Sequence, residues 1–381
     1  MHTRRGFLHT VLGTTFTAGS VIDQALLRAA RARAQSNDRL PVLFDIDRIA
    51  DGVYAALAKP QTLLNCNAVV FENAEDILIM DSHSKPSAVA SLVRQLRDQV
   101  TRKPVRYVVA SHFHWDHAQG LPAYRRVAPH ADLVASEATR KLIGDQTLPR
   151  LKQSFTDLEK SVEDYRKKAA DARTPEERNA YQQMLRETRD YLNEMKNYAP
   201  ELPNLTLDRD LIIHDKAHDL HLAFRGRGHT AGDVVVFCPQ KKTVATGDLL
   251  HGFFPFIADG YPNDWPRTLL DVAQFEFTAI AGGHGSVFRS RDRLFQMGNY
   301  IEELTELVAR GRREGKPLAR VQQEVTPASL KTLADGGYGA RSAEAVLRFR
   351  MIPPPKPDTA SVISDSVKTN IEHIYSALSR T

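Results

Sequence analysis

The stretch "SHFHWDHAQG" at residues 111–120 places three histidines and an aspartate within six positions. It follows "PVRYVVA" at residues 104–110, whose apolar and β-branched composition predicts a buried strand. Imidazole rings are costly to crowd into an apolar interior unless their nitrogens have partners. The side chains that need such a partner are those of His112, His114, Asp116 and His117.

Three later segments carry the same residue types into loops. They are "GRGHTAGD" (226–233), "ATGDLLHG" (245–252) and "AGGHGS" (281–286), and each adjoins an apolar run that predicts a strand. Loops at strand ends are where α/β proteins build their sites. We therefore expect the histidines and aspartates of all four segments to meet in space.

The chemistry that unites these residue types is metal binding. Zinc takes neutral imidazole nitrogen and carboxylate oxygen as ligands, and a catalytic site keeps one position open. Because alternate residues of an extended segment point the same way, His112 and His114 can bind one ion. Asp116 and His117 follow a bend and can turn toward a second ion. The residues left to complete the two ions are His229, His284 and a bridging Asp248.

These motifs, in this order, resemble the metallo-β-lactamase superfamily of αββα metallohydrolases over roughly residues 41–290. Asp81 in "LIMDSH" resembles the acidic residue that ends an early strand in that family. The resemblance implies an α/β fold built as a four-layer αββα sandwich. It also implies two zinc ions, the first on His112, His114 and His229, the second on Asp116, His117 and His284, with Asp248 between them.

The resemblance implies a hydrolase acting on a small molecule. Water bound to zinc has its pKa lowered to about 7, which provides hydroxide at neutral pH. The expected reaction is therefore cleavage of an ester, thioester, lactone or amide bond. Asp116 is expected to orient the hydroxide as well as to bind metal, so Asp116 and Asp248 are the expected catalytic residues.

Two other activities stay open at this point. Members that hydrolyse β-lactam antibiotics typically carry Cys or Ser where this chain carries Asp248. This difference argues against β-lactam hydrolysis as the main activity. Persulfide dioxygenases share most of these ligands but use a single iron ion. Imidazole and carboxylate suit iron as well as zinc, so the ligands alone do not name the metal.

The residues expected to contact the substrate lie on loops beside the motifs. The segment 250–266 is rich in aromatic residues and predicts an apolar pocket wall. The expected substrate contacts are His83, His251, Phe253, Tyr261 and Trp265.

Residues 151–199 interrupt the strands with two amphipathic helices. Apolar residues recur at spacings of three and four on either side of "TPEE" at 174–177, where Thr174 is the expected helix cap. The pattern predicts an antiparallel helical hairpin. Three uses stay open for it: packing on its parent domain, a homodimer contact, or a lid over the pocket.

The chain from 291 to 381 is predicted to be a mainly helical extension, with a final helix beginning near Asp365. The two cysteines, Cys66 and Cys238, lie far apart in apolar runs. Isolated cysteines of this kind are more often buried thiols than a disulfide, so we expect them to be unpaired.

The first 34 residues resemble a twin-arginine export signal. "TRRGFLHT" (3–10) sets paired arginines before a short apolar run, and "ARA" (32–34) offers a cleavage site. That run is well short of the ~20 residues needed to span a bilayer. We therefore expect a mature domain over residues 35–381 in the periplasm or beyond.

Charge argues against a nucleic-acid partner. The full chain carries a net charge of +5, but residues 1–34 contain five arginines and only one aspartate. The remainder is close to neutral and lacks the basic excess that drives binding to phosphate backbones.

Overall fold

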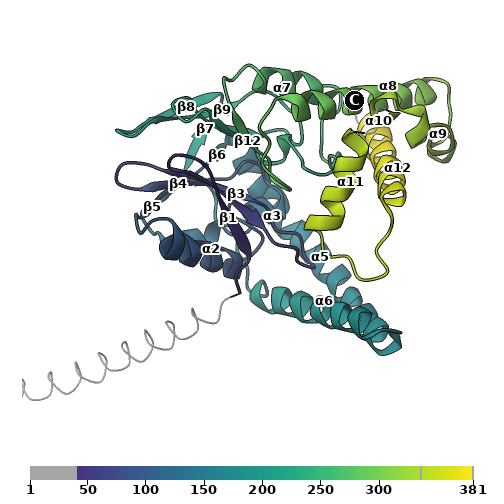
Figure 1. The fold of residues 1–381 in the computed structure, drawn as a ribbon, viewed down its shortest axis with the longest axis horizontal. Helices are drawn as coiled ribbons and strands as arrows, with labels where there is room; N and C mark the ends of the chain where they lie inside the picture. Colours follow the sequence, from purple (N-terminus) through teal and green to yellow (C-terminus); the bar gives the residue numbers. More distant parts are fainter. Residues whose placement is uncertain (1–40, 335–336, 380–381) are drawn as a thin grey trace, which may run out of the picture.

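Two β-sheets face each other at the centre of the protein, and helices cover the outer face of each (Figure 1). This arrangement comes from a computed structural model that describes residues 41–334 and 337–379. The expected export signal, residues 1–34, lies outside the described residues.

The first sheet has the strand order β1-β2-β3-β4-β5-β6-β7. Neighbours are antiparallel from β1 to β4 and parallel from β4 to β7. The turn "NAED" (73–76) joins β3 to β4 as a hairpin, as the sequence predicts. The strands are β1 (Phe44–Ala50), β2 (Val53–Ala58), β3 (Ala68–Glu72), β4 (Ile77–Met80), β5 (Val105–Val109), β6 (Asp132–Ser136) and β7 (Leu205–Leu207).

The second sheet has the order β12-β11-β10-β9-β8, with β11 and β12 parallel and the other neighbours antiparallel. Every residue of β10 is buried, because helices cover one face of the sheet and the first sheet covers the other. Its strands are β8 (Asp210–His214), β9 (Asp219–Phe224), β10 (Val234–Cys238), β11 (Thr243–Ala245) and β12 (Ala279–Ala281).

Three apolar layers hold the sheets and helices together. Leu92 of α2 (Pro86–Gln99) and Leu121 of α4 (Leu121–Val127) pack on the outer face of the first sheet. Alternate residues of β10 pack into the other two apolar layers, since successive strand residues point to opposite faces of the sheet. Val236 packs between the sheets, whereas Val235 packs outward on the helices of the C-terminal half. The expected four-layer αββα sandwich is thereby confirmed.

The helical hairpin is present, but its first helix begins earlier than expected. The helix α5 (Glu137–Asp171) starts directly after β6, where the Ser136 side chain accepts a hydrogen bond from the Thr139 backbone N–H at 3.1 Å. Pro149 lies inside this helix without ending it, so the first arm of the hairpin continues from the end of β6 as one helix. The second arm, α6 (Pro175–Glu194), begins at the predicted Thr174 cap.

The base of the hairpin packs on the parent domain. The Tyr191 hydroxyl donates a hydrogen bond to Gln119 Oε1 at 2.7 Å, and the Thr62 backbone N–H donates one to Glu187 Oε2 at 2.7 Å. The Tyr191 ring also meets Trp115 edge to face, with centroids 6.1 Å apart. Of the three uses left open, these contacts match packing on the parent domain, and a homodimer stays a prediction.

The extension from 291 is mainly helical, as expected. Its last helix begins at Thr359 rather than near Asp365, because Asp358 caps it by accepting a hydrogen bond from the Ser361 N–H at 2.7 Å. No helix in the described part is long and apolar enough to cross a membrane. The helices are α7 (Trp265–Val272), α8 (Asp292–Arg313), α9 (Leu318–Glu324), α10 (Lys331–Ala334), α11 (Tyr338–Phe349) and α12 (Thr359–Ala377).

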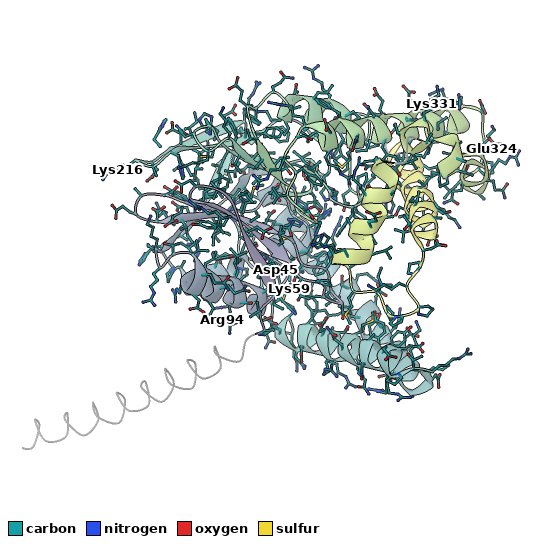
Figure 2. The ribbon with its side chains drawn as sticks, viewed as in Figure 1. Asp45, Lys59, Arg94, Lys216, Glu324 and Lys331 are labelled. Carbon is teal, nitrogen blue, oxygen red and sulfur yellow. The ribbon has the colours of Figure 1, made fainter. Side chains whose placement is uncertain are left out.

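Charged side chains lie on the outside of these layers, as Figure 2 shows for Lys216 and Glu324. Lys59 Nζ lies 3.2 Å from Asp45 Oδ1 at the sheet edge formed by β1 and β2. Both cysteines are buried and unpaired, which confirms the expectation for them.

The extension is part of the core, and this is testable at Leu304 of α8, which is fully buried against the second sheet. We expect Leu304→Ala to lower the free energy of unfolding by about 2–5 kcal/mol, because it removes buried apolar contacts and leaves a cavity. Chemical denaturation measures the change. As a control, Leu270→Ala on the exposed side of α7 should change it by less than about 0.5 kcal/mol. Equal effects of the two variants would contradict this placement.

Candidate metal centre

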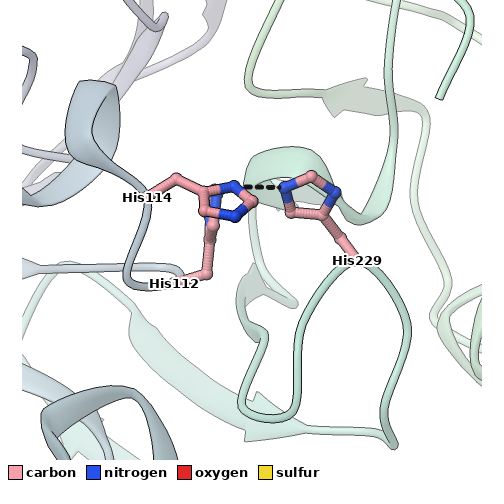
Figure 3. A group of neighbouring side chains, drawn as sticks. All are labelled: His112, His114 and His229. Atoms are coloured by element: carbon pink, nitrogen blue, oxygen red, sulfur yellow. Dashed lines mark hydrogen bonds between the residues drawn. The ribbon is translucent and has the colours of Figure 1, made fainter. Parts of the chain in front are cut away.

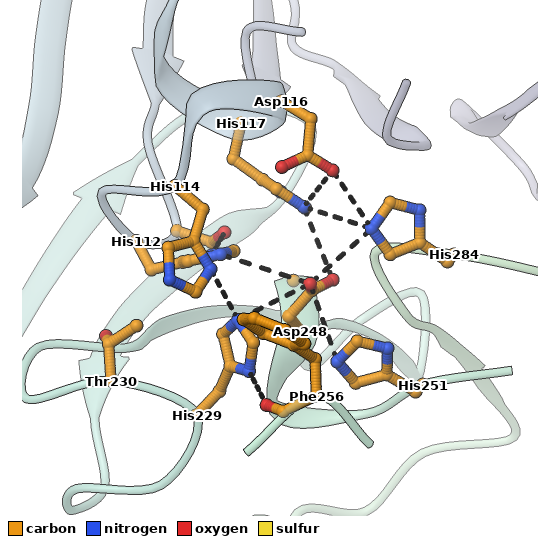
Figure 4. A network of polar contacts seen from close by, with 12 residues as sticks. His112, His114, Asp116, His117, His229, Thr230, Asp248, His251, Phe256 and His284 are labelled. Carbon is orange, nitrogen blue, oxygen red and sulfur yellow. Dashed lines mark hydrogen bonds and ion pairs between the residues drawn. The ribbon is translucent and has the colours of Figure 1, made fainter. Parts of the chain in front are cut away.

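The loops at one edge of both sheets converge on a single buried cluster (Figure 4). His112 and His114 lie in the loop that follows β5, where His114 has extended backbone, and the short helix α3 (Trp115–Ala118) then turns Asp116 and His117 in another direction. The loops after β9, β11 and β12 supply the other three side chains. All seven expected ligands are at most 8% exposed: His112, His114, Asp116, His117, His229, Asp248 and His284.

The first group consists of three imidazoles (Figure 3). The nearest ligand atoms of His112, His114 and His229 all lie within 4.8 Å of one another. His229 Nε2 is 2.8 Å from His114 Nδ1, and these two rings meet edge to face. This is the set of residues that the sequence predicts for the first ion.

The second group combines a carboxylate with two imidazoles. His284 Nε2 lies 3.1 Å from Asp116 Oδ2 and 3.4 Å from His117 Nε2. These three side chains again have donor atoms within 4.8 Å of one another. They are the residues predicted for the second ion.

Asp248 lies between the two groups. Its Oδ2 is 3.5 Å from His229 Nε2 of the first group and 3.5 Å from His284 Nε2 of the second. Its Oδ1 is 3.3 Å from His117 Nε2. One carboxylate therefore faces both groups, as a bridging ligand would.

Each of three histidine rings has an outer nitrogen, which points away from the cluster toward an acceptor, and an inner nitrogen, which points into the cluster. The partner of the outer nitrogen determines whether the inner one is free to bind a cation. His229 Nδ1 is held by the Phe256 carbonyl at 3.1 Å, and His114 Nε2 by Asp259 Oδ2 at 2.9 Å. His117 Nδ1 lies 2.9 Å from Asp81 Oδ2. A proton on each outer nitrogen leaves a lone pair on the inner one, which is the arrangement of metal-binding histidines.

The inner atoms are poorly satisfied by the protein alone. His112 Nε2 and Asp248 Oδ1 are buried without a hydrogen-bond partner in the described part of the chain. Buried polar atoms of this kind cost free energy unless something else pairs with them. The donor set of nitrogen and carboxylate oxygen fits divalent cations such as zinc.

Burial and neighbouring charges shift the pKa values of these side chains in opposite directions. Burial favours the neutral acid at Asp248, but the nearby charges of His251, His284 and His117 outweigh it and hold the pKa of this carboxyl well below its usual range. Burial opposes charge on His284 too, yet Asp248 and Asp116 raise its pKa to about 9. Burial and neighbouring histidines instead hold the pKa of His112 and His229 well below the usual value. The negative charge favoured on Asp248 and the positive charge favoured on His284 therefore face each other where cations would bind.

Glycine at position 283 allows the approach of the ligands. A Cβ atom there would lie 2.0 Å from Asp248 Oδ1 and 2.7 Å from His117 Cε1. Any larger residue would therefore displace a ligand from each side. The second glycine of "GGHG" is required by the site itself.

A supporting pair that the sequence did not indicate lies behind His114. Asp259 accepts the hydrogen bond from His114 Nε2. It also accepts hydrogen bonds from both terminal nitrogens of Arg150, at 2.8 and 2.7 Å. Arg150 belongs to α5, so the hairpin reaches the candidate ligand His114 through Asp259. No motif marks Asp259 in the sequence, because only the folded chain brings it to His114.

Asp81 supports the centre from the end of β4. Its carboxylate accepts a hydrogen bond from the Ser111 N–H at 2.9 Å and faces His117 on its other oxygen. Its backbone is in the left-handed region, at φ 75°. Such strain in a residue other than glycine is typical of functional sites. Asp81 therefore orders the loop that carries His112 and His114.

A cavity of about 700 Å³ opens above the ligands. His251 and Phe253, two of the expected substrate contacts, line it beside Asp248. His251 Nε2 is 3.5 Å from Asp248 Oδ2, and neither of its ring nitrogens has a hydrogen-bond partner among the described residues. Both side chains are therefore placed to meet a substrate.

The other three expected contacts lie elsewhere. Trp265 is fully buried behind His229, and its indole N–H donates a hydrogen bond to the Leu249 carbonyl at 3.1 Å. Burial of its large ring in the core gains more free energy than partial exposure on a pocket wall. His83 is also fully buried, with Nδ1 3.5 Å from Cys66 Sγ. Tyr261 lines a neighbouring hollow, under the guanidinium of Arg227.

Comparisons with known proteins gave the following results. Three solved structures resemble the chain: a metallo-beta-lactamase from Pontibacter korlensis (17% identity, 67% of this chain and 98% of that one, TM-score 0.49), the mono-zinc form of the metallo-beta-lactamase FIM-1 from Pseudomonas aeruginosa (19%, 69% and 96%, 0.47), and a metallo-beta-lactamase from Hirschia baltica (14%, 68% and 97%, 0.47). A search of curated proteins gives no match.

The family assignment rests on the sequence itself. The family model described as "Metallo-beta-lactamase superfamily" matches residues 62–299, which is more than half of the chain and contains all seven expected ligands. The chain therefore belongs to the metallo-beta-lactamase superfamily, whose members are generally metal-dependent hydrolases.

Proposed function

We propose that this protein is a dinuclear zinc hydrolase that cleaves an ester, thioester, lactone or amide bond of a small molecule. The observation that carries the proposal is the position of Asp248, whose carboxylate faces two separate donor groups at the floor of one cavity. His112, His114 and His229 would hold one ion, and Asp116, His117 and His284 the other.

The two ions, when bound, supply a nucleophile from water at neutral pH and polarise the bond to be cleaved. The protein's own residues supply position and selectivity. Asp116 lines the cavity with one carboxylate oxygen 3.1 Å from His284, so its other oxygen is available to orient water. His251 and Phe253 line the cavity beside Asp248, where they would contact the substrate.

Export through the twin-arginine route is part of the proposal and rests on residues 1–34 alone. That route accepts folded proteins, which suits a metal centre assembled from four distant loops. Fractionation of cells that express the full chain tests it, and retention of a Arg4→Lys, Arg5→Lys variant in the cytoplasm is the expected result.

Asp248→Ala should abolish hydrolysis and lower the bound zinc below two ions per chain, because both donor groups lose their shared carboxylate. Metal analysis gives the stoichiometry, and a panel of aryl esters, thioesters, lactones and a cephalosporin gives the activity and the bond class. Asp365→Ala is the matched control for metal content and should keep two bound zinc ions, since Asp365 lines the same cavity outside both donor groups. Full activity with two bound zinc ions in the Asp248 variant would refute the dinuclear mechanism.

Arg150→Gln should weaken zinc binding by about 10–100-fold, because Asp259 then loses the pair that orients it toward His114. Competition with a chromogenic chelator measures the affinity, and Asp259→Asn should have a similar effect. Arg166→Gln provides the control, since Arg166 lies on the exposed face of the same helix. Wild-type affinity in both site variants would show that this pair does not support the metal.

A further inference from the structure

The cavity above the ligands is closed partly by the C-terminal extension. Its floor includes Asp248 and His284, and its walls include Phe253 together with Val346 and Arg350 from α11 and the residue that follows it. The last two lie outside the region matched by the family model, which ends at residue 299. The extension therefore contributes part of the cavity wall, from residues outside the region that the family model matches.

Most of the remaining wall is apolar. Leu63 and Leu64 precede β3, Phe254 and Phe256 come from the loop after β11, and Ile352 follows α11. Such a wall favours a substrate with an apolar body, which gains free energy on leaving water.

Two guanidinium groups line this cavity, and they differ in their partners. Arg150 makes a two-pronged ion pair with Asp259, so its charge is balanced within the protein. The Arg350 side chain forms neither a hydrogen bond nor an ion pair within the described part of the chain. Asp365 lines the same cavity but forms no ion pair with Arg350 among those residues. The charge of Arg350 is therefore available to a ligand.

The surroundings of Arg350 make an anionic ligand favourable. Arg350 is exposed to solvent, although the protein atoms near its guanidinium lower its pKa, against a smaller opposing effect from Asp116. An arginine nevertheless stays charged in proteins. A guanidinium on the wall of a cavity gains more from an anion than one on open surface, because the surrounding protein lowers the effective dielectric constant.

Resting on the proposed hydrolase function, we propose that the substrate carries a carboxylate that pairs with Arg350 while its apolar body fills the wall and its scissile bond lies at Asp248. The planar guanidinium matches a carboxylate with two parallel hydrogen bonds. Arg350 is then a specificity-determining residue of this chain.

A pair of esters of equal chain length tests this proposal: para-nitrophenyl hexanoate, which is neutral, and mono-para-nitrophenyl adipate, which ends in a carboxylate. With the zinc-loaded enzyme, Arg350→Gln should raise KM for the adipate ester by about tenfold or more and leave KM for the hexanoate ester unchanged. The kcat values should change little, because Arg350 contacts the substrate away from the reacting bond.

Two further variants sharpen the result. Arg350→Lys keeps the charge but loses the paired donors, so it should restore only part of the preference. Arg348→Gln removes an exposed guanidinium two residues away, outside the cavity, and should behave as wild type. An unchanged ratio of the two KM values in Arg350→Gln would overturn the carboxylate subsite and leave the hydrolase proposal standing.

A binding measurement separates failure of the subsite from failure of the function. Calorimetry compares phenylbutyrate with its neutral amide, phenylbutyramide, on the wild-type protein with and without zinc. Tighter binding of phenylbutyrate that is lost in Arg350→Gln supports the subsite even if no ester is hydrolysed. Equal binding of phenylbutyrate to the wild type and Arg350→Gln would overturn it, because the carboxylate would then be held by the metals or by nothing specific.

Discussion

The structure depends on the convergence of imidazole nitrogens and carboxylate oxygens that the protein itself leaves without adequate partners. Asp248 faces donors on two sides, and His112 Nε2 is buried without a hydrogen bond in the described part of the chain. Burial of such groups is unfavourable unless cations or protons balance them. The same desolvation would strengthen the binding of a divalent cation by these donors.

Three separate parts of the protein hold these donors in place. The first sheet positions one loop through Asp81 at the end of β4. This carboxylate accepts a hydrogen bond from the Ser111 N–H and faces His117, both of which follow β5. The hairpin acts through Arg150 and Asp259 on His114. The second half acts through Arg293, whose guanidinium donates hydrogen bonds to the carbonyls of residues 251–253 and so holds the backbone beside Asp248. Ligand geometry is thus a property of the whole fold.

Local patterns predicted the layers well and the boundaries less well. The strand β10 is a short run of Val, Phe and Cys, and its burial on both faces follows from this apolar composition. The start of α12 was wrong because a single side chain, Asp358, decides where that helix begins. Trp265 and Tyr261 were expected on the pocket wall because they share an aromatic segment. The structure instead turns one into the core and the other into a neighbouring hollow, since composition does not tell which way a loop residue points.

The sequence by itself determined the family, the four layers and the seven candidate ligands, because each ligand lies in a motif beside a strand and strand ends meet at one edge of a sheet. Only the tertiary structure decided what surrounds them. Asp259 and Arg150 are separated by more than a hundred residues in the chain, and Arg350 reaches the cavity from an extension without a motif. Contacts between distant segments arise from how helices pack on the sheets, and no local pattern of residues encodes them.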